Sequence, residues 1–240
     1  LRSSFSAESG ELVEKKPSGP GTRRRRLDEI VSSRLSKRYP RTPRINCELI
    51  NRESISPNIR NARKKVIRGM FERYGQEMLG FSGHGPEVTI FRCLFMATRA
   101  YTLQPDLTWK FDFDNLSDCA GGENKGFAAV IQKIHGLCAP SKKDRSFQEF
   151  YDELTAAPYG VCRELIPLFL VATFVEGEYS YSLYEDGRFI PTVNSDVIEK
   201  MHAGPSRFTI RVLDQNEDYA AFLQIYEEHF TPKDYDVAGE

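Results

Sequence analysis

Three aspartates in the segment TWKFDFDNLSDC, residues 108–119, have the residue type and spacing of a metal-binding carboxylate cluster: Asp112, Asp114 and Asp118. Metal-dependent nucleases and phosphatases use such carboxylates to hold a divalent cation that activates the attacking water. Asp112 and Asp114 would share one face of a predicted strand, but the segment contains no His to complete such a site. We therefore favour a solvent-facing strand edge and turn, and a metal-dependent nuclease is the least favoured alternative.

The four histidines and five cysteines show none of the spacings typical of metal or redox chemistry. The sequence has no H-x-x-x-H, H-E-x-x-H or C-x-x-C pattern, and the glycine-rich GFSGHG lacks the G-x-x-x-x-G-K-[ST] signature of a phosphate-binding loop. We predict no cofactor, no metal and no catalytic residue, and the chain itself is not expected to be an enzyme. A Cys/His pair assembled only in space stays an alternative. The odd number of scattered cysteines favours a reducing cytoplasm over a disulfide framework.

The clearest helix in the sequence is basic, and it lies in SISPNIRNARKKVIRGMFERYG. Ser56 is a good N-cap, Pro57 suits the first helical position, and Gly75 is placed to end the helix. One continuous apolar stripe repeats at helical spacing and comprises Ile59, Ala62, Val66, Ile67, Met70, Phe71 and Tyr74. This face is predicted to belong to the core.

The basic residues of this helix are the predicted binding site for DNA or a partner protein: Arg60, Arg63, Lys64, Lys65 and Arg68. At about 100° per residue, Lys64, Lys65 and Arg68 lie opposite the apolar stripe, whereas Arg63 lies within it. The favoured interpretation of Arg63 is a stem packed in the core and a head paired with a carboxylate such as Glu48 or Glu53. The alternative is a guanidinium held for a phosphate or for a partner's carboxylate.

Charge is distributed unequally along the chain, although the net charge is only −1. Residues 1–80 carry 19 Lys/Arg against 9 Asp/Glu, and residues 81–240 carry 14 against 25. Such asymmetry indicates either a polyanion-binding first half or electrostatic docking of one half on the other. Four arginines at 23–26 lead into a helix ending by Tyr39; a solvated charge run is favoured there, with phosphate contact as the alternative.

The secondary-structure elements predicted around these residues indicate a mainly helical α+β fold. Residues 1–22 read as a flexible tail or linker, 23–140 as a helical subdomain with the basic helix, and 141–240 as a winged-helix-like subdomain with a β-hairpin. Because the longest apolar run, residues 165–175, is far shorter than the roughly 20 residues of a membrane span, no membrane crossing is expected.

The winged-helix-like subdomain has the order of elements of a DNA reader but the wrong surface for one. Ser146 and Glu149 form a capping box for one helix, and Asp186-Gly187 is a type I′ turn signal for the hairpin. The helix between them is apolar on all sides, which indicates burial, with Pro167 marking a kink or a late start. A last amphipathic helix is predicted at 217–230.

Three stretches carry a family resemblance: RYPRTPRINCELINRESISPNIRNARKKVIRGMFE, LGFSGHGPEVTIFRCL, and the run from YDELTAAPYGVCRELIPLFLVATF through YSLYEDGRFIPTV to VIEKMHAGPSRFTI. Together they resemble the segment C-terminal to the P-loop core of large bacterial ATP-binding proteins of phage-defence and DNA-modification systems, BREX-like and related. The resemblance spans roughly residues 38–212. Cys47 and Cys162 depart from the residue types expected at their positions.

The resemblance implies an accessory domain whose nucleotide site lies elsewhere in a parent NTPase. The expected function is a non-catalytic regulatory or coupling module that contacts DNA, a partner protein or other domains of the parent. The main alternative is a purely structural protein–protein interaction domain, in which the basic half docks on the acidic half or on a sister subunit of a homo-oligomer.

Overall fold

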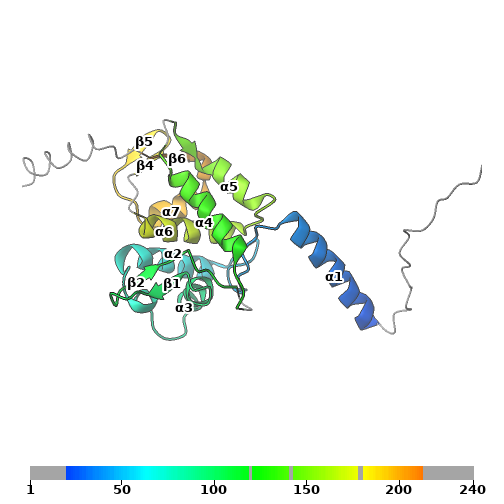
Figure 1. The fold of residues 1–240 in the computed structure, drawn as a ribbon. Coiled ribbons are helices and arrows are strands. Elements are labelled where there is room, and N and C mark those ends of the chain that lie inside the picture. Colours follow the sequence, from blue (N-terminus) through cyan, green and yellow to red (C-terminus); the bar gives the residue numbers. More distant parts are fainter. Residues whose placement is uncertain (1–19, 119–120, 141–142, 178–180, 213–240) are drawn as a thin grey trace, which may run out of the picture. The chain divides into compact units, whose positions relative to one another are not determined.

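A computed structural model describes residues 20–118, 121–140, 143–177 and 181–212 of the chain (Figure 1). Most of the predicted tail, Cys119 and the predicted helix at 217–230 lie outside the described residues. The chain divides into two compact units at Tyr39/Pro40. The first contains one described helix, α1 (Pro20–Arg38), and each unit is described by itself. The predicted boundary at residue 140 stays a prediction.

The second unit begins, after a loop, with the basic helix α2 (Pro57–Glu72). The Ser56 side chain accepts a hydrogen bond from the Ile59 N–H, as its N-cap position predicts. Helix α2 packs against α3 (Pro86–Phe91), which continues into a π-helical turn at Arg92–Met96. A small antiparallel hairpin follows, formed by β1 (Tyr101–Leu103) and β2 (Trp109–Phe111).

Helix α6 (Ile166–Glu176) lies at the centre of the second unit, between α2 and α4 (Lys125–Cys138) (Figure 1). All nine of its residues from Ile166 to Phe174 are buried, so the prediction of a core helix is confirmed. Pro167 marks a late helix start, because the preceding residues Arg163–Leu165 form a separate 3-10 turn. At this position its missing N–H breaks no helical hydrogen bond.

The larger sheet has four antiparallel strands in the order β3-β6-β4-β5. Its strands are β3 (Arg145–Ser146), β4 (Tyr181–Glu185), β5 (Arg188–Ile190) and β6 (Phe208–Val212). The β4–β5 turn has positive φ at both Asp186 and Gly187, as a type I′ turn requires. The predicted hairpin is therefore confirmed, and β6 extends it on the β4 side.

Two short helices join the sheet to the core. Helix α5 (Phe147–Thr155) follows β3 and is capped by the Ser146 hydroxyl, which accepts from the Gln148 N–H. Helix α7 (Ser195–Ala203) is capped by the Asn194 side chain and packs on α2. The α+β, mainly helical fold class is thus observed. Within the described ranges, no helix has the length and hydrophobicity of a membrane span.

Candidate functional site

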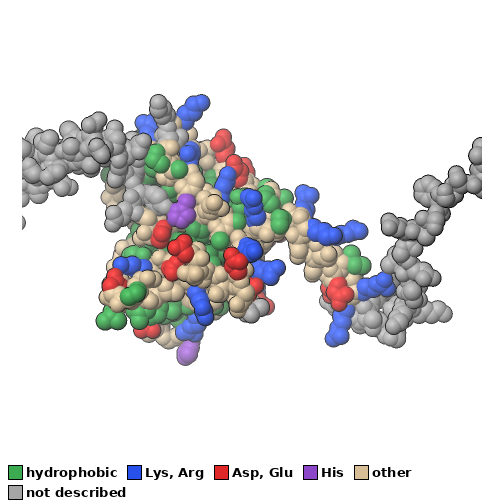
Figure 2. All heavy atoms as spheres, viewed as in Figure 1, with side chains coloured by type: hydrophobic (Ala, Val, Ile, Leu, Met, Phe, Trp, Pro, Cys, Tyr) green, Lys and Arg blue, Asp and Glu red, His purple; other side chains and the backbone are tan. Residues whose placement is uncertain are grey.

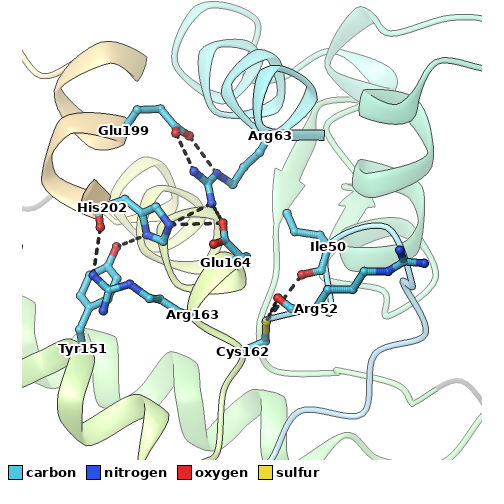
Figure 3. Close-up of polar contacts among 9 residues, drawn as sticks. All are labelled: Ile50, Arg52, Arg63, Tyr151, Cys162, Arg163, Glu164, Glu199 and His202. Carbon is cyan, nitrogen blue, oxygen red and sulfur yellow. Dashed lines mark hydrogen bonds and ion pairs between the residues drawn. The ribbon is translucent and has the colours of Figure 1, made fainter. Parts of the chain in front are cut away.

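The basic helix sends Arg63 into the interior, where it joins three elements of the second unit (Figure 3). The Arg63 side chain is only 1% exposed. Its Nε donates to Oε1 of Glu199 at 2.9 Å, and Nη2 donates to Oε2 of the same carboxylate at 2.6 Å. Nη1 donates to Oε2 of Glu164. Because two planar groups meet through two parallel hydrogen bonds, the Arg63–Glu199 pair fixes the orientation of α7 on α2.

His202 extends this arrangement to α5. Its Nε2 lies 3.1 Å from Arg63 Nη1 and 3.3 Å from Glu164 Oε2, and its Nδ1 lies 3.2 Å from the Tyr151 hydroxyl. Both ring nitrogens of His202 therefore have polar neighbours within the cluster. The Arg163 guanidinium lies 5.1 Å from the centre of the Tyr151 ring, and its Nη2 donates to the His202 carbonyl. We call these six residues the Arg63 cluster: Arg63, Tyr151, Arg163, Glu164, Glu199 and His202.

The electrostatics of the Arg63 cluster favour the charged form of Glu164. Burial alone would raise the pKa of Glu164, but the hydrogen bond from His202 and the positive charge of Arg63 outweigh it, and the pKa lies below the usual value. Burial raises the pKa of Tyr151, so its hydroxyl stays protonated. The cluster is therefore a set of ion pairs and hydrogen bonds that joins α2, α5 and α7.

An open pocket of about 540 Å³ lies over the Arg63 cluster. Its lining comes from α2, the 3-10 turn before α6, and α7: Arg60, Arg63, Arg163, Glu164, Glu199, Lys200, His202 and Ala203. Of the predicted binding residues, Arg60 and Arg63 contribute to this pocket.

The other three predicted residues are paired on the surface of α2. Lys64 pairs with Asp196, Lys65 Nζ lies 3.2 Å from a Glu87 carboxylate oxygen, and Arg68 lies 3.9 Å from Glu72. The predicted solvent-facing position of Lys65 and Arg68 agrees with their side-chain exposure of 61% and 54%. The five predicted residues therefore have three different environments. Arg63 is buried in ion pairs, and Arg60 lines the pocket. The remaining three pair with carboxylates on the surface of α2.

The expected partners of Arg63 are wrong. Neither Glu48 nor Glu53 reaches it, and its carboxylates come from 101 and 136 residues further along the chain. Local sequence could not select them, because the choice depends on how α6 and α7 pack on α2. Two sequence signals bear on them: Glu164 is the acidic residue directly before an apolar run, and Glu199 and His202 are three apart on one helical face.

The predicted aspartate cluster is divided. Asp112 and Asp114 line a separate pocket of about 330 Å³ that also contains His135 and Glu176, whereas Asp118 lies 3.4 Å from Arg44. Burial and the nearby aspartate charges raise the pKa of Glu176, while His135 lowers it. Among the described residues, no group of three or more His, Cys, Asp or Glu side chains is arranged to hold a metal ion.

Helix α1 differs from α2 in that its apolar side chains are exposed. Its sequence holds seven Lys/Arg and two Asp/Glu, and the blue side chains along it are visible in Figure 2. One face carries Leu27, Ile30, Val31 and Leu35, with exposed fractions of 46% to 60%. Among the described residues of this unit, no second element packs on the stripe.

Comparisons of the chain with protein-family models, with curated proteins and with solved structures found no match.

Proposed function

We propose that this chain is a non-catalytic interaction module that docks on an acidic protein surface through helix α1. The observation that carries the proposal is the combination on α1 of an exposed apolar stripe with a net positive charge. An amphipathic helix of this kind binds by laying its apolar face into a groove, and surrounding charges select the partner.

The state of α2 supports placing the contact on α1. Lys64 and Lys65 each pair with a carboxylate of the same chain, and Arg63 is buried. A partner's phosphate or carboxylate would have to displace these internal pairs. Helix α2 therefore serves mainly to join the elements of the second unit.

We combine this proposal with the resemblance of the chain to a segment of phage-defence NTPases. The acidic partner is then another domain of a parent NTPase, and the module couples that domain to the rest of the assembly. The elements α5, α6 and the β4–β5 hairpin are proposed to form a winged-helix-like scaffold. Because α6 is buried, this scaffold acts in assembly rather than by inserting a helix into a DNA groove.

The docking proposal is tested by site-specific photo-crosslinking in the parent protein, with the probe placed at Val31 on the stripe. Ser33, which is separated from Val31 by about 160° around the same helix, is the matched control position. A cross-link from position 31, absent at position 33, to an acidic segment of the parent is expected. Equal cross-linking from both positions, or none from either, would overturn the proposal.

A second candidate function, binding of duplex DNA, is favoured by the four consecutive arginines at 23–26. Fluorescence anisotropy with a labelled duplex would show affinity falling steeply with salt, by about 0.9 log units per log unit of salt for each phosphate contacted. The double charge reversal Lys64→Glu/Lys65→Glu distinguishes DNA binding through α1 from DNA binding through α2. DNA binding through α1 survives it, whereas binding through α2 is lost.

A further inference from the structure

We propose that the pocket over the Arg63 cluster binds a small phosphate-bearing molecule. This inference concerns the second unit alone and does not depend on α1. It rests on the charge of the pocket, on the donors that its internal pairs leave unused, and on the residue types of its lining.

The lining carries more positive than negative charge. Arg60, Arg63, Arg163 and Lys200 face two carboxylates, Glu164 and Glu199, and Lys200 also pairs with Glu185 at 2.7 Å. Four cations against these three carboxylates leave an excess of +1, His202 not counted. A phosphate monoester carries about −1.5 to −2 near pH 7. The charge of such a ligand is therefore opposite in sign to the excess charge of the pocket.

Hydrogen-bond donors remain available at two arginines of the lining. Arg163 gives one N–H to the His202 carbonyl at 3.2 Å, which leaves most of its five donors uncommitted. Arg60 is exposed, and no ion pair engages it among the described parts of the chain. Arginine forks of this kind match the oxygens of a phosphate.

The two carboxylates of the lining are already committed to Arg63. Glu199 accepts from both Nε and Nη2, and Glu164 accepts from Nη1. Arg63 therefore offsets one of these two negative charges, and Figure 3 shows both carboxylates directed at its guanidinium. The cationic side chains of the pocket wall therefore make an anion the preferred ligand of the pocket. Arg163 is also held over the Tyr151 ring, so less conformational freedom is lost when a ligand binds.

The lining favours a small phosphate compound over a nucleic acid strand. Its residues include Ala203 but no Phe, Tyr or Trp. Proteins that bind single strands stack the bases on aromatic rings, and this pocket offers none in its described lining. The proposed ligand is therefore recognised by its phosphate group.

Isothermal titration calorimetry of the 240-residue chain with inorganic phosphate, at constant ionic strength, tests the proposal. Saturable binding at one site is expected. Arg60→Gln should weaken it at least tenfold, or about 1.4 kcal/mol, without changing the denaturation midpoint. Arg68→Gln is the matched control, because Arg68 is an exposed arginine of the same helix that lies outside the pocket.

Phosphate binding of equal strength in wild type and Arg60→Gln, or no saturable binding in wild type, would overturn the proposal. Arg163→Gln tests a second lining residue, from the 3-10 turn before α6, and it too should weaken binding. Glucose 6-phosphate serves as a monoester probe and should compete with phosphate in a manner that depends on Arg60. Competition by a DNA duplex that depends equally on Arg60 would instead assign the pocket to nucleic acid.

Discussion

Replacing Arg63 by Met tests how far the second unit depends on the Arg63 cluster. Met keeps an unbranched apolar stem but removes the guanidinium, leaving Glu164 and Glu199 with side chains only 14% and 16% exposed and no cation between them. Breaking a buried ion pair from one side costs about 3–5 kcal/mol. That is a large share of the roughly 5–15 kcal/mol by which a domain is stable.

The cost should depend on pH, with a sign fixed by the carboxylates. The pKa of Glu164 in the folded protein lies below its ordinary value of 4.5. Its contribution to stability is therefore present above about pH 4.5 and is lost as the pH falls through the folded pKa. In Arg63→Met, burial of Glu164 remains without the arginine charge. The difference in unfolding free energy between wild type and variant should be largest near pH 7 and shrink toward pH 4.

Urea denaturation followed by circular dichroism at several pH values measures this difference. Arg68→Met is the control, because Arg68 is exposed and its surface pair with Glu72 is worth about 0–1 kcal/mol. The double variant Arg63→Met/Glu199→Gln should lose less than the sum of the single losses, since both remove the same interaction. A loss below about 1 kcal/mol for Arg63→Met at pH 7, or a loss independent of pH, would refute the reasoning.

Three further predictions concern single positions. A Cβ at Gly126 would overlap the carbonyl of Thr42, so Gly126→Ala should destabilise the protein by about 1–3 kcal/mol. At Gly136 on the same helix a Cβ meets nothing within 4 Å, so Gly136→Ala should stabilise it by about 0.5–1 kcal/mol. Thermal melts of the two variants test both values. Asn194→Ala removes the N-cap of α7 and should cost about 1 kcal/mol in urea denaturation, whereas an unchanged midpoint would contradict that role. Burial raises the pKa of Cys47 to about 11, so iodoacetamide at pH 8 should leave this thiol unmodified in the folded chain and label it only in urea, as peptide mass spectrometry would show.

Features with a local cause were predictable from the sequence. The N-caps at Ser56 and Ser146, the type I′ turn at Asp186-Gly187 and the late helix start at Pro167 each follow from chemistry within a few residues. The anomaly of Arg63 was also visible, because a cation within an apolar stripe needs a partner wherever the helix packs.

The pairing of the basic side chains on α2 could not be predicted, because a basic helical face does not by itself show which charges are neutralised. Lys64 pairs with Asp196, which lies on α7, far along the chain. The sequence gives the charge of such a lysine but not the carboxylate that packing brings beside it. The row of cations predicted as a binding face is, in the fold, partly an internal contact.

The sequence by itself determined that residues 165–175 belong to the interior and that Arg63 must be compensated, since both follow from the periodicity and polarity of short segments. Only the tertiary structure decided that Glu164 and Glu199 compensate it, that His202 and Tyr151 extend the cluster, and that a pocket with excess positive charge lies above. The physical reason is that ion pairs and pockets depend on the packing of α2, α6 and α7. Side chains more than a hundred residues apart meet there only after the chain has folded.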